Sequence, residues 1–268
     1  MSIISYDFGM RVISWNVNSI RTRIERIISL LERHNPDLLC LQETKVRDEE
    51  FPSETFEEAG YLCEIHGQKT YNGVALLSKE ELEDVKIGFD GDPYPEQARV
   101  ISGVLRGIRF INIYVINGKH IDDEKFTMKM KWLKALQGWI KTNFSPEEPI
   151  VLLGDFNIAP KEIDVHDPKE WKNILFTSKE LSQLESIKKL GFEDVFRLYN
   201  QEKDMFSWWD YRNQSFRFNR GLRIDLALAT KRATQCSSGS FIDREERRQG
   251  NFEAKPSDHA PLIVDFID

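Results

Sequence analysis

Apolar residues along this chain gather in short continuous runs, most of them bounded by turn-forming or charged residues. Runs of this kind are typical of buried or half-buried β-strands. One of them, Ile150-Val151-Leu152-Leu153, follows a turn around Pro146 and Pro149 and is expected to be buried. The pattern predicts strands at residues 11–16, 38–41, 61–65, 74–77, 100–105, 109–115, 150–153, 223–230 and 261–266.

Two further segments carry apolar residues at the spacing of an amphipathic helix. The first follows residue 16, with Ser19 as its expected N-cap, and Asn35-Pro36 is expected to end it. The second spans residues 125–140. Its buried stripe is expected to consist of Phe126, Met130, Leu133, Leu136 and Ile140.

A third helix is predicted from the residues at its two ends. Thr177 and Glu180 form the sequence of a capping box, and Gly191 is suited to ending the helix. Residues 159–176, which precede it, are expected to form a long polar loop. Because several neighbouring strands are joined by short loops, the chain favours two mixed sheets packed face to face and covered by helices, which is an α/β sandwich.

The composition is typical of a globular protein. The length of 268 residues allows one or two domains, and 40% of the residues are hydrophobic. No apolar stretch approaches the roughly 18 residues of a membrane helix, and the N-terminus lacks the basic start and apolar core of a signal peptide. Cys40, Cys63 and Cys236 lack metal-ligand spacing, so we expect reduced thiols and a cytoplasmic location. We interpret residues 1–9 as a short extension or a mis-assigned start.

The formal net charge of −7 lowers the expectation of a protein that binds nucleic acid through charge alone. An acidic protein can still bind DNA where a metal cation lies in the site and basic residues line one groove. The charge is therefore compatible with a metal-dependent nuclease.

Polar side chains recur at or just beyond the ends of the predicted strands. In Gly154-Asp155-Phe156-Asn157, an acid and an amide two residues apart point to the same side of a strand end. Any single member could be a cap or a turn residue, but carboxylate and amide oxygens together are the ligands of hard cations such as Mg²⁺ and Mn²⁺. The candidates are Asn16, Glu43, Tyr114, Asp155, Asn157, Asp225, Asp258 and His259.

The histidine in this set indicates the kind of chemistry. One histidine beside several acids is typical of an orienting or base role in hydrolysis rather than of a soft-metal site. The chain lacks a Cys/His zinc cluster and the Gly-x-Ser-x-Gly turn of serine esterases. It also lacks a Walker loop and a dinucleotide fingerprint. The residues thus favour hydrolysis at a site for a hard divalent cation.

Five short motifs contain all of these candidates except Tyr114, and a sixth motif, over residues 206–212, is rich in aromatic residues. They are Ser14-Trp15-Asn16-Val17-Asn18, Gln42-Glu43-Thr44-Lys45, Gly154-Asp155-Phe156-Asn157, Phe206-Ser207-Trp208-Trp209-Asp210-Tyr211-Arg212, Gly221-Leu222-Arg223-Ile224-Asp225 and Pro256-Ser257-Asp258-His259-Ala260-Pro261. In this order, over nearly the whole chain, they resemble the motifs of the exonuclease III/AP endonuclease family, within the DNase I-like phosphoesterases. The resemblance implies a four-layer α/β sandwich that forms a single domain over residues 1–268.

The resemblance also implies a role for each polar residue. A divalent ion, Mg²⁺ with Mn²⁺ as a substitute, is expected at Asn16, Glu43, Asp155, Asn157, Asp258 and His259. Asp155 is expected to orient or deprotonate the attacking water. His259, oriented by Asp225, is expected to hold phosphate oxygens, and Asn157 would assist it. Tyr114 matches the catalytic tyrosine, so the expected catalytic residues are Tyr114, Asp155, Asn157, Asp225 and His259.

Further residues match or lie near DNA-contacting positions of the family. Lys129 matches a lysine that approaches the phosphate, and we expect it on the helix face opposite the apolar stripe. Trp208 and Trp209 are expected to stack on a base or sugar or to wall the pocket for an extrahelical site, with one of them in the core. The expected DNA-binding residues are Arg99, Lys129, Trp208, Trp209, Arg212, Arg220 and Arg223.

The chain departs from the family pattern around Tyr114. The common form is Asn-x-Tyr-x-Pro-x-Gly, but Ile116 stands here for the proline, so residues 117–123 are expected to lie differently. In addition, the segments 67–73 and 164–173 resemble a bacterial subgroup, some members of which have a partly blocked AP-site (abasic-site) pocket. Such a block favours trimming of 3′-phosphates and 3′-ends. The groups expected to cause it here are Trp171, Lys172 and Asn173.

The resemblance predicts a monomeric DNA-repair nuclease that acts on double-stranded DNA with AP sites or 3′-blocked ends. The reaction would be Mg²⁺-dependent hydrolysis of phosphoesters giving 3′-OH ends, through 3′–5′ exonuclease, AP endonuclease and 3′-phosphatase or phosphodiesterase activities. The order of preference among these activities is open, and a 3′-end specialist with weak AP endonuclease activity would fit the same residues.

Two competing functions share the fold that the motifs imply. The first is a lipid or inositol phosphatase, a sphingomyelinase or a deadenylase of the same superfamily, and the Gly221–Asp225 and aromatic motifs favour DNA over these substrates. The second is a non-catalytic nucleic-acid-binding regulator, a kind of protein that loses the acidic ligands. Glu43, Asp155 and Asp258 are all present in this chain, which argues against the regulator.

Overall fold

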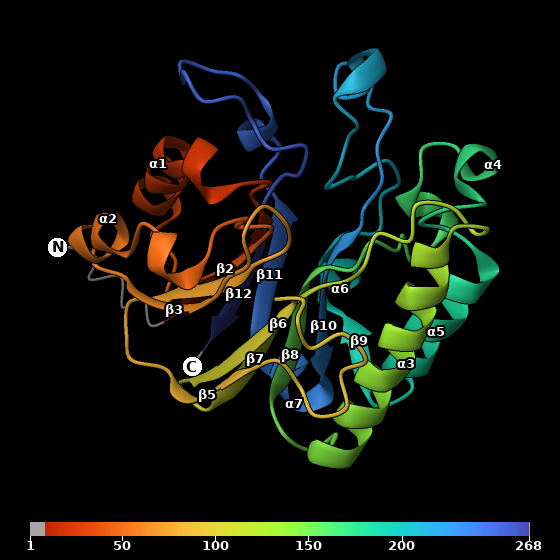
Figure 1. The fold of residues 1–268 in the computed structure, drawn as a ribbon, viewed down its shortest axis with the longest axis horizontal. Coiled ribbons are helices and arrows are strands. Elements are labelled where there is room, and N and C mark those ends of the chain that lie inside the picture. The colour runs from red at the N-terminus through yellow and green to blue at the C-terminus, as the bar shows by residue number, and fades with distance from the viewer. Residues whose placement is uncertain (1–8, 268) are drawn as a thin grey trace, which may run out of the picture.

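Two six-stranded sheets pack face to face in the computed structural model, which describes residues 9–267 (Figure 1). The predicted extension at residues 1–9 lies outside this range except for Gly9, which begins the first strand. The first sheet has the order β11-β12-β1-β2-β4-β3, from β1 Gly9–Asn16, β2 Leu38–Gln42, β3 Leu62–His66, β4 Val74–Ser78, β11 Ser237–Ile242 and β12 Leu262–Ile267. The second has the order β5-β6-β7-β8-β10-β9, from β5 Glu83–Ile87, β6 Val100–Leu105, β7 Ile108–Tyr114, β8 Ile150–Asp155, β9 Phe192–Asp194 and β10 Asp225–Thr230.

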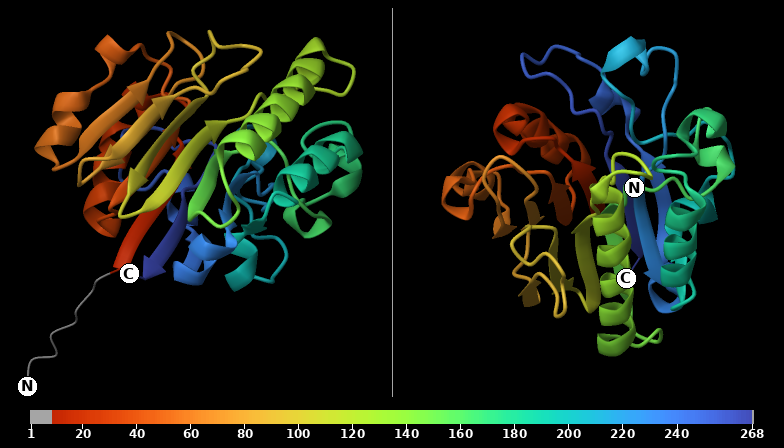
Figure 2. Two further views of the ribbon diagram at one scale, coloured as in Figure 1. Left: turned by 90° about the horizontal axis from the view of Figure 1, so that it is seen from below. Right: turned by 45° about the vertical axis from the view of Figure 1, so that its right-hand side comes forward.

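Helices cover the outer face of each sheet and give the molecule four layers. On the first sheet lie α1 Ile24–His34 and α2 Ser53–Glu58, and on the second lie α3 Glu124–Asn143 and α5 Ser178–Lys188 (Figure 2). The short helices are α4 Pro168–Trp171, α6 Val195–Tyr199 and α7 Lys231–Cys236. This arrangement confirms the predicted four-layer α/β sandwich. Within residues 9–267, no helix is both long enough and apolar enough to cross a membrane.

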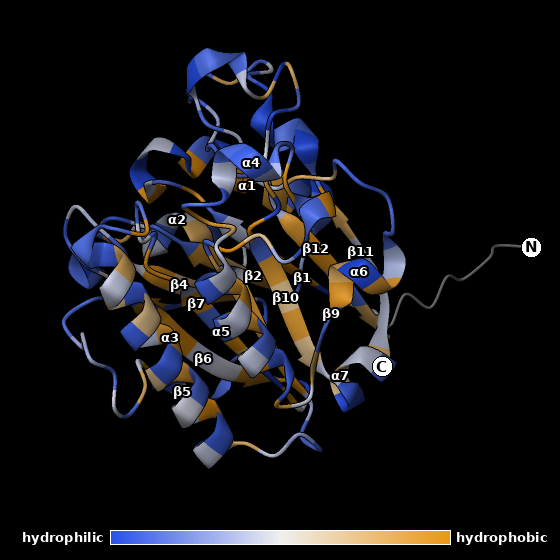
Figure 3. Ribbon diagram, turned by 90° about the vertical axis from the view of Figure 1, so that its right-hand side faces the viewer, coloured by the Kyte–Doolittle hydropathy of each residue, from blue (hydrophilic) through white to orange (hydrophobic). Residues whose placement is uncertain are grey.

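Alternation of side chains along the strands builds the apolar layers. In β1, Val12 points into the layer between the sheets and Ile13 into the layer beneath α1. In β8, Leu153 points into the layer between the sheets and Leu152 into the layer beneath α3 and α5. Central strands are therefore buried on both faces, which explains their continuous apolar sequences. The strands are largely hydrophobic and the helices carry many hydrophilic positions (Figure 3).

Strand directions bring the predicted site residues to one end of both sheets. β1 and β2 are parallel, with Asn16 paired to Gln42, and β7 and β8 are parallel, with Tyr114 paired to Asp155. β10 is antiparallel to β8, so its first residue, Asp225, pairs with Asp155 at the same end. β12 likewise starts beside the end of β1. The segments before β10 and β12 project beyond the sheets at this end (Figure 1).

The predicted helix ends are partly confirmed. Asn35 ends α1 in a left-handed conformation, and Thr177 and Glu180 form the predicted capping box. Ser19, however, does not cap α1: it has φ 94° and precedes a short 3₁₀ turn, and α1 begins at Ile24. The Ser19 side chain makes no capping hydrogen bond in this position.

Other differences concern weakly patterned segments. The sequence pattern does not predict β5, β9, β11 or α2; β5 is mostly exposed and polar, and β9 spans three residues. Residues 159–176 are not polar throughout, because Ala159, Val165 and Leu175 form a small apolar cluster with Leu222. This cluster fastens the segment to the strand end that carries Asp225.

Candidate active site

Asn16 links two acidic residues at the centre of the site. Its side-chain Nδ2 donates to Glu43 Oε1 at 2.8 Å and to Asp155 Oδ2 at 2.9 Å. Asn16 ends β1, Glu43 follows β2 and Asp155 ends β8, so one amide connects the first sheet with the second. Asn16 and Asp155 are buried, whereas Glu43 is half-buried. The two carboxylates therefore face one space from different sheets.

Local backbone geometry fixes the direction of the Asp155 carboxylate. Gly154 has φ +138°, and a Cβ added there would lie 2.0 Å from the Ile113 carbonyl oxygen, so glycine is required where β8 approaches β7. Asn157 has φ 49°, and its backbone N–H donates to Asp155 Oδ1 at 2.8 Å. Its side-chain Nδ2 donates to Asp155 Oδ2 at 3.1 Å. Within the segment Gly154–Asn157, the last residue thus fixes the Asp155 side chain through two hydrogen bonds.

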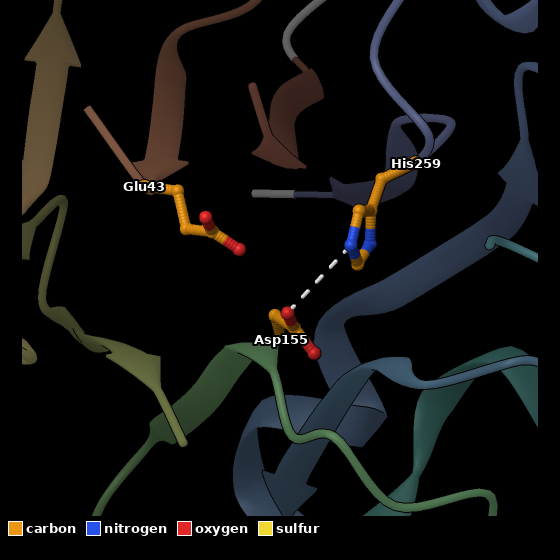
Figure 4. A group of neighbouring side chains, drawn as sticks. All are labelled: Glu43, Asp155 and His259. Carbon is orange, nitrogen blue, oxygen red and sulfur yellow. Dashed lines mark ion pairs between the residues drawn. The ribbon is translucent and has the colours of Figure 1, made fainter. Parts of the chain in front are cut away.

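His259 lies against two carboxylates. Its Nδ1 is 2.9 Å from Asp225 Oδ2, and its Nε2 is 3.8 Å from Asp155 Oδ2. The loop before β12 brings His259 to the ends of β8 and β10. The side chains of Glu43, Asp155 and His259 point toward a common space (Figure 4).

Burial and neighbouring charges shift both groups of the Asp155–His259 pair. Burial raises the pKa of Asp155 to about 7, with the carboxylates of Asp225 and Glu43 adding to the rise and His259 opposing it. Burial alone would lower the pKa of His259, but the carboxylates of Asp225 and Asp155 outweigh it and raise that pKa to about 10. At neutral pH His259 is therefore cationic and can donate from both ring nitrogens.

Tyr114 and Arg99 form a second wall beside Glu43. The guanidinium carbon of Arg99 lies 4.8 Å from the centre of the Tyr114 ring, and Arg99 Nη1 donates to the Tyr114 carbonyl oxygen at 3.0 Å. Burial raises the pKa of Tyr114 well above its ordinary value, and the Glu43 carboxylate adds to the rise. Tyr114 therefore keeps its phenolic proton at neutral pH. Lys45 Nζ lies 2.8 Å from Glu43 Oε2 and places a positive charge at the same wall.

Asp258 is hydrogen-bonded by two side chains at the rim of the site. Asn18 Nδ2 donates to its Oδ1 at 2.9 Å, and Trp208 Nε1 donates to its Oδ2 at 3.0 Å. Burial alone would raise the pKa of Asp258, but the charge of His259 and these hydrogen bonds lower it. Trp208 packs edge-on against Trp171, with ring centres 5.5 Å apart. Asp258 thus connects the charged part of the site to an aromatic pair.

The donor set fits a hard divalent cation. Ligand atoms of Glu43, Asp155 and His259 lie within 4.8 Å of one another, and two of the three residues are carboxylates. The raised pKa of Asp155 reflects negative charge that a cation would neutralise. Because His259 is cationic, it suits an anionic substrate oxygen better than a metal ion. Glu43 and Asp155, with Asn16 between them, are the better-suited ligands.

A cleft of about 470 Å³ opens beside Glu43 and Tyr114. Its charged lining residues are mostly basic, in contrast to the net charge of −7 of the whole chain. They are Lys45, Arg99, Lys119 and Lys125, with Glu43 and Glu96 as the acids. A cleft of this charge suits a phosphate-bearing chain.

The predicted surface position of Lys129 is wrong. Its side chain is fully buried, and its Nζ donates to the Asn157 carbonyl oxygen at 2.6 Å and pairs with the Glu180 carboxylate. Helical spacing explains the error: Lys129 lies three residues after Phe126 and four before Leu133, and residues so spaced share one helix face. Lys129 therefore has no surface with which to contact DNA.

Arg223 and Trp209 are also fully buried, so the predicted DNA contacts are wrong for both. Arg223 makes four hydrogen bonds to the carboxylates of Asp164 and Asp194. Trp209 Nε1 donates to Asn219 Oδ1 at 3.1 Å. One of the two tryptophans thus lies in the core, as expected. The remaining predicted DNA contacts are the exposed Arg212 and Arg220, the partly buried Trp208, and Arg99, which is 7% exposed.

Three residues of the site are missing from the sequence prediction. The contacts are Lys45 with Glu43, Asn18 with Asp258, and Asn117 Nδ2 with Asn157 Oδ1 at 2.8 Å. Lys45 and Asn18 each lie two residues from a predicted ligand, inside the motifs that carry the resemblance, so their spacing along a strand end was a usable signal. Asn117 lies in the loop that departs from the family pattern, where no sequence pattern indicates its direction.

Comparisons with known proteins show to which class of enzyme this chain is similar. The model of the Endonuclease/Exonuclease/phosphatase family matches residues 13–259. Exodeoxyribonuclease III of Haemophilus influenzae is 36% identical over 96% of this chain and 100% of its own length. Among solved structures, a 3′ phosphatase from Neisseria bound to a product DNA hairpin is 36% identical, with a TM-score of 0.91 over 96% of this chain and 99% of that chain. An AP endonuclease from Archaeoglobus fulgidus is 37% identical, with a TM-score of 0.91 over the same shares.

The fold and the matches define a phosphoester hydrolase of the endonuclease/exonuclease/phosphatase class. Within that class, the chain belongs to the exonuclease III/AP endonuclease family of DNA-repair nucleases. The family, fold and enzyme class predicted from the sequence motifs are thereby confirmed.

Proposed function

We propose that this protein hydrolyses phosphoesters in double-stranded DNA at AP sites or at 3′-blocked ends, with Mg²⁺ as its cofactor, and leaves 3′-OH ends. The observation that carries the proposal is the convergence of Asn16, Glu43, Asp155 and His259 on one space between two sheets. The carboxylates of Glu43 and Asp155 can bind a cation, and the cationic imidazole of His259 can bind an anion. These groups are close enough together to act on a single phosphate group.

Each side chain has a role that follows from its protonation state. Glu43 and Asp155, linked by Asn16, would hold Mg²⁺, or Mn²⁺ in its place. Such an ion would neutralise charge on a phosphate oxygen and on the leaving oxygen. Asp155, held by Asn16 and Asn157 at the end of β8, would orient or deprotonate the attacking water. His259, oriented by Asp225 and charged, would donate to a phosphate oxygen and stabilise the transition state.

The phenol of Tyr114 is the neutral donor among the phosphate-binding groups. Tyr114 stays protonated and stands beside Glu43, so it can donate a hydrogen bond or a proton to a phosphate oxygen. Asn157 has a different role, because its backbone N–H and side-chain amide both donate to Asp155 and so hold that carboxylate.

The Trp171–Trp208 pair favours 3′-end trimming as the preferred activity. The two rings pack edge-on at 5.5 Å beside the apolar cluster of Val165, Leu175 and Leu222. Trp208 donates to Asp258 at the rim of the site, so we infer that Trp171 would stand in the way of an extrahelical abasic sugar that approached from this side. The Neisseria relative is described as a 3′ phosphatase and the Archaeoglobus relative as an AP endonuclease at nearly equal identity, so overall similarity does not decide between the activities.

A duplex assay tests the proposal. One substrate carries a single AP-site analogue and the other a single 3′-phosphate, each incubated with Mg²⁺ and, as a control, with EDTA. We expect Mg²⁺-dependent product from both substrates, with faster turnover of the 3′-phosphate. Product from neither substrate would contradict the proposed function, and equal turnover of both would contradict the 3′-end preference.

A further inference from the structure

Lys129 is a buried cation with no place among the roles described so far. It lies on α3, its side chain is fully buried, and its Nζ is directed at the end of β8 rather than at solvent. The ammonium has two partners: the carbonyl oxygen of Asn157 at 2.6 Å and the carboxylate of Glu180. Burial lowers the pKa of Lys129, while the carboxylates of Glu180 and Asp155 oppose this effect.

The contact with Asn157 falls on a residue with a left-handed backbone. Asn157 has φ 49°, a conformation that asparagine adopts more readily than most residues with a side chain, so its hydrogen bonds decide in which direction the turn points. Its N–H and side-chain amide both donate to Asp155, and its Nδ2 also donates to the Val115 carbonyl oxygen. Lys129 binds the remaining backbone group, the carbonyl oxygen. Every polar group of Asn157 thus has a hydrogen-bond partner, and Lys129 is the partner of its carbonyl oxygen.

Glu180 allows a charged lysine in this position. Its side chain is fully buried, and its second carboxylate oxygen accepts from the Thr177 backbone N–H at 2.9 Å in the capping box of α5. The carboxylate is therefore fixed by the helix start, and it neutralises the ammonium at a place where neither side chain is exposed to the surface. The pair connects α3 and α5 to the turn that follows β8.

Stability alone does not account for a buried pair of this kind. Replacing a buried ion pair by apolar residues of similar volume is often neutral or stabilising by roughly 1–4 kcal/mol, because both charges lose their hydration. Here the pair lies behind the segment Gly154–Asn157, which carries both Asp155 and Asn157. A rigid donor at this carbonyl oxygen fixes the direction of both side chains.

We propose that Lys129 is a positioning residue for catalysis, which holds the left-handed turn at Asn157 through its carbonyl oxygen and so directs the Asp155 carboxylate, to which Asn157 donates, into the site. Glu180 serves as the charge partner of the lysine. The inference rests on the proposed function, because it assigns Lys129 a role in that reaction. It replaces the expected contact between Lys129 and DNA.

Two variants separate this role from a general structural one. Lys129→Met/Glu180→Gln removes the donor and both charges while keeping the side-chain volumes, and Glu180→Gln alone keeps the donor at Asn157. On the 3′-phosphate duplex with Mg²⁺, we expect the double variant to lose at least about tenfold in kcat with KM unchanged, since the DNA-contacting surface is untouched. Glu180→Gln should stay within about threefold of wild type, because the contact with Asn157 remains.

A double-mutant cycle with Asn157→Ala tests whether the two changes affect kcat independently. If Lys129 only stabilised the fold, the two losses in kcat would be additive. If Lys129 acts through Asn157, the Lys129→Met/Glu180→Gln change should reduce kcat by a clearly smaller factor in the Asn157→Ala background than in wild type, because the side-chain bond from Asn157 to Asp155 is already lost there. Should Lys129→Met/Glu180→Gln not fold, it is replaced by Lys129→Met/Glu180→Met, which leaves no buried side-chain amide without its former partner. Additive losses in the cycle, or a double variant with wild-type kcat, would overturn the inference while leaving the proposed function intact. Wild-type protein inactive on the duplex would overturn both.

Discussion

Asp155 and Asp225 are directly paired residues of the antiparallel strands β8 and β10, so two carboxylates lie side by side in a buried site. His259 binds Asp225 at 2.9 Å and approaches Asp155 at 3.8 Å. The single positive charge of His259 does not neutralise both carboxylates, so the site has a net negative charge that a cation would balance. Burial raises the pKa of Asp155 and the neighbouring carboxylates add to the rise, whereas for His259 the two carboxylates raise the pKa against the effect of burial.

The first prediction concerns the alkaline limit of activity. His259 is cationic below its pKa of about 10, and the Asp225 carboxylate is the largest contribution that raises this pKa. Asp225→Asn should therefore lower the His259 pKa, move the alkaline loss of kcat to lower pH, and reduce the maximal kcat by about 10²-fold through weaker phosphate stabilisation. The measurement is the kcat–pH profile for 3′-phosphate release. Asp265→Asn, at an acid on β12 paired with Arg11, is the control and should leave the profile unchanged.

The second prediction concerns the stability of the metal-free protein. Asp155 has a folded-state pKa of about 7 against about 3.9 in an unfolded chain, and His259 about 10 against about 6.5. Both groups bind more protons in the folded state, so their contribution to stability is lost as pH rises, over about pH 4–7 for Asp155 and about pH 6.5–10 for His259. In EDTA, Tm should fall between pH 5 and pH 9.

Two further measurements, one with Mg²⁺ and one with a variant, test why Tm falls with rising pH. Saturating Mg²⁺ should raise Tm more at pH 9 than at pH 5, because the cation takes the place of the proton. Asp155→Asn removes one of the two titrating groups and should give a shallower fall of Tm with pH than wild type. Equal slopes for the two proteins would show that Asp155 does not titrate as described.

The third prediction concerns substrate choice. Trp171→Ala should open the space beside Trp208 and raise the ratio of AP-site cleavage to 3′-phosphate release by about tenfold, which corresponds to about 1.4 kcal/mol. Trp171→Phe keeps an aromatic ring against Trp208 and should keep most of the wild-type ratio. A ratio that is the same in wild type and Trp171→Ala would rule out Trp171 as the blocking group.

The fourth prediction separates buried from exposed arginines. Arg223→Met leaves the buried Asp164 and the partly buried Asp194 without their common partner and should destabilise the protein by about 3–5 kcal/mol in urea unfolding. Arg212→Met changes a side chain that is 82% exposed and should leave stability unchanged. If Arg212 contacts a phosphate, the same change should weaken DNA binding and reduce its salt dependence. Similar stability of the two variants would contradict the buried ion network.

The fold and the charged centre were predictable from sequence because local signals determined both. Apolar runs marked the central strands, and polar residues such as Asn16 and Asp155 directly followed or ended those runs. Since the strands bearing them are parallel neighbours or antiparallel partners with paired ends, residues at the strand ends meet in space. The six motifs then indicated the four-layer α/β sandwich of the family.

Buried charges were not predictable because their partners are distant in sequence. Lys129 and Glu180 are 51 residues apart, and Arg223 and Asp164 are 59 apart. A lysine or arginine without a visible partner is normally expected at the surface. For Lys129 the helical spacing to Phe126 indicated burial, but the charge argued against it. The contact of Trp171 with Trp208 likewise depends on how the segment 159–176 folds over the strand ends.

The most direct test of the account is Mg²⁺-dependent release of phosphate from a duplex with one 3′-phosphate, compared between wild type, Glu43→Ala and Asp155→Asn. We predict turnover by wild type that EDTA abolishes, and no detectable turnover by either variant at any Mg²⁺ concentration, with Tm showing that both variants are folded. Turnover near the wild-type rate by either variant would contradict the assignment of the site between Glu43, Asp155 and His259.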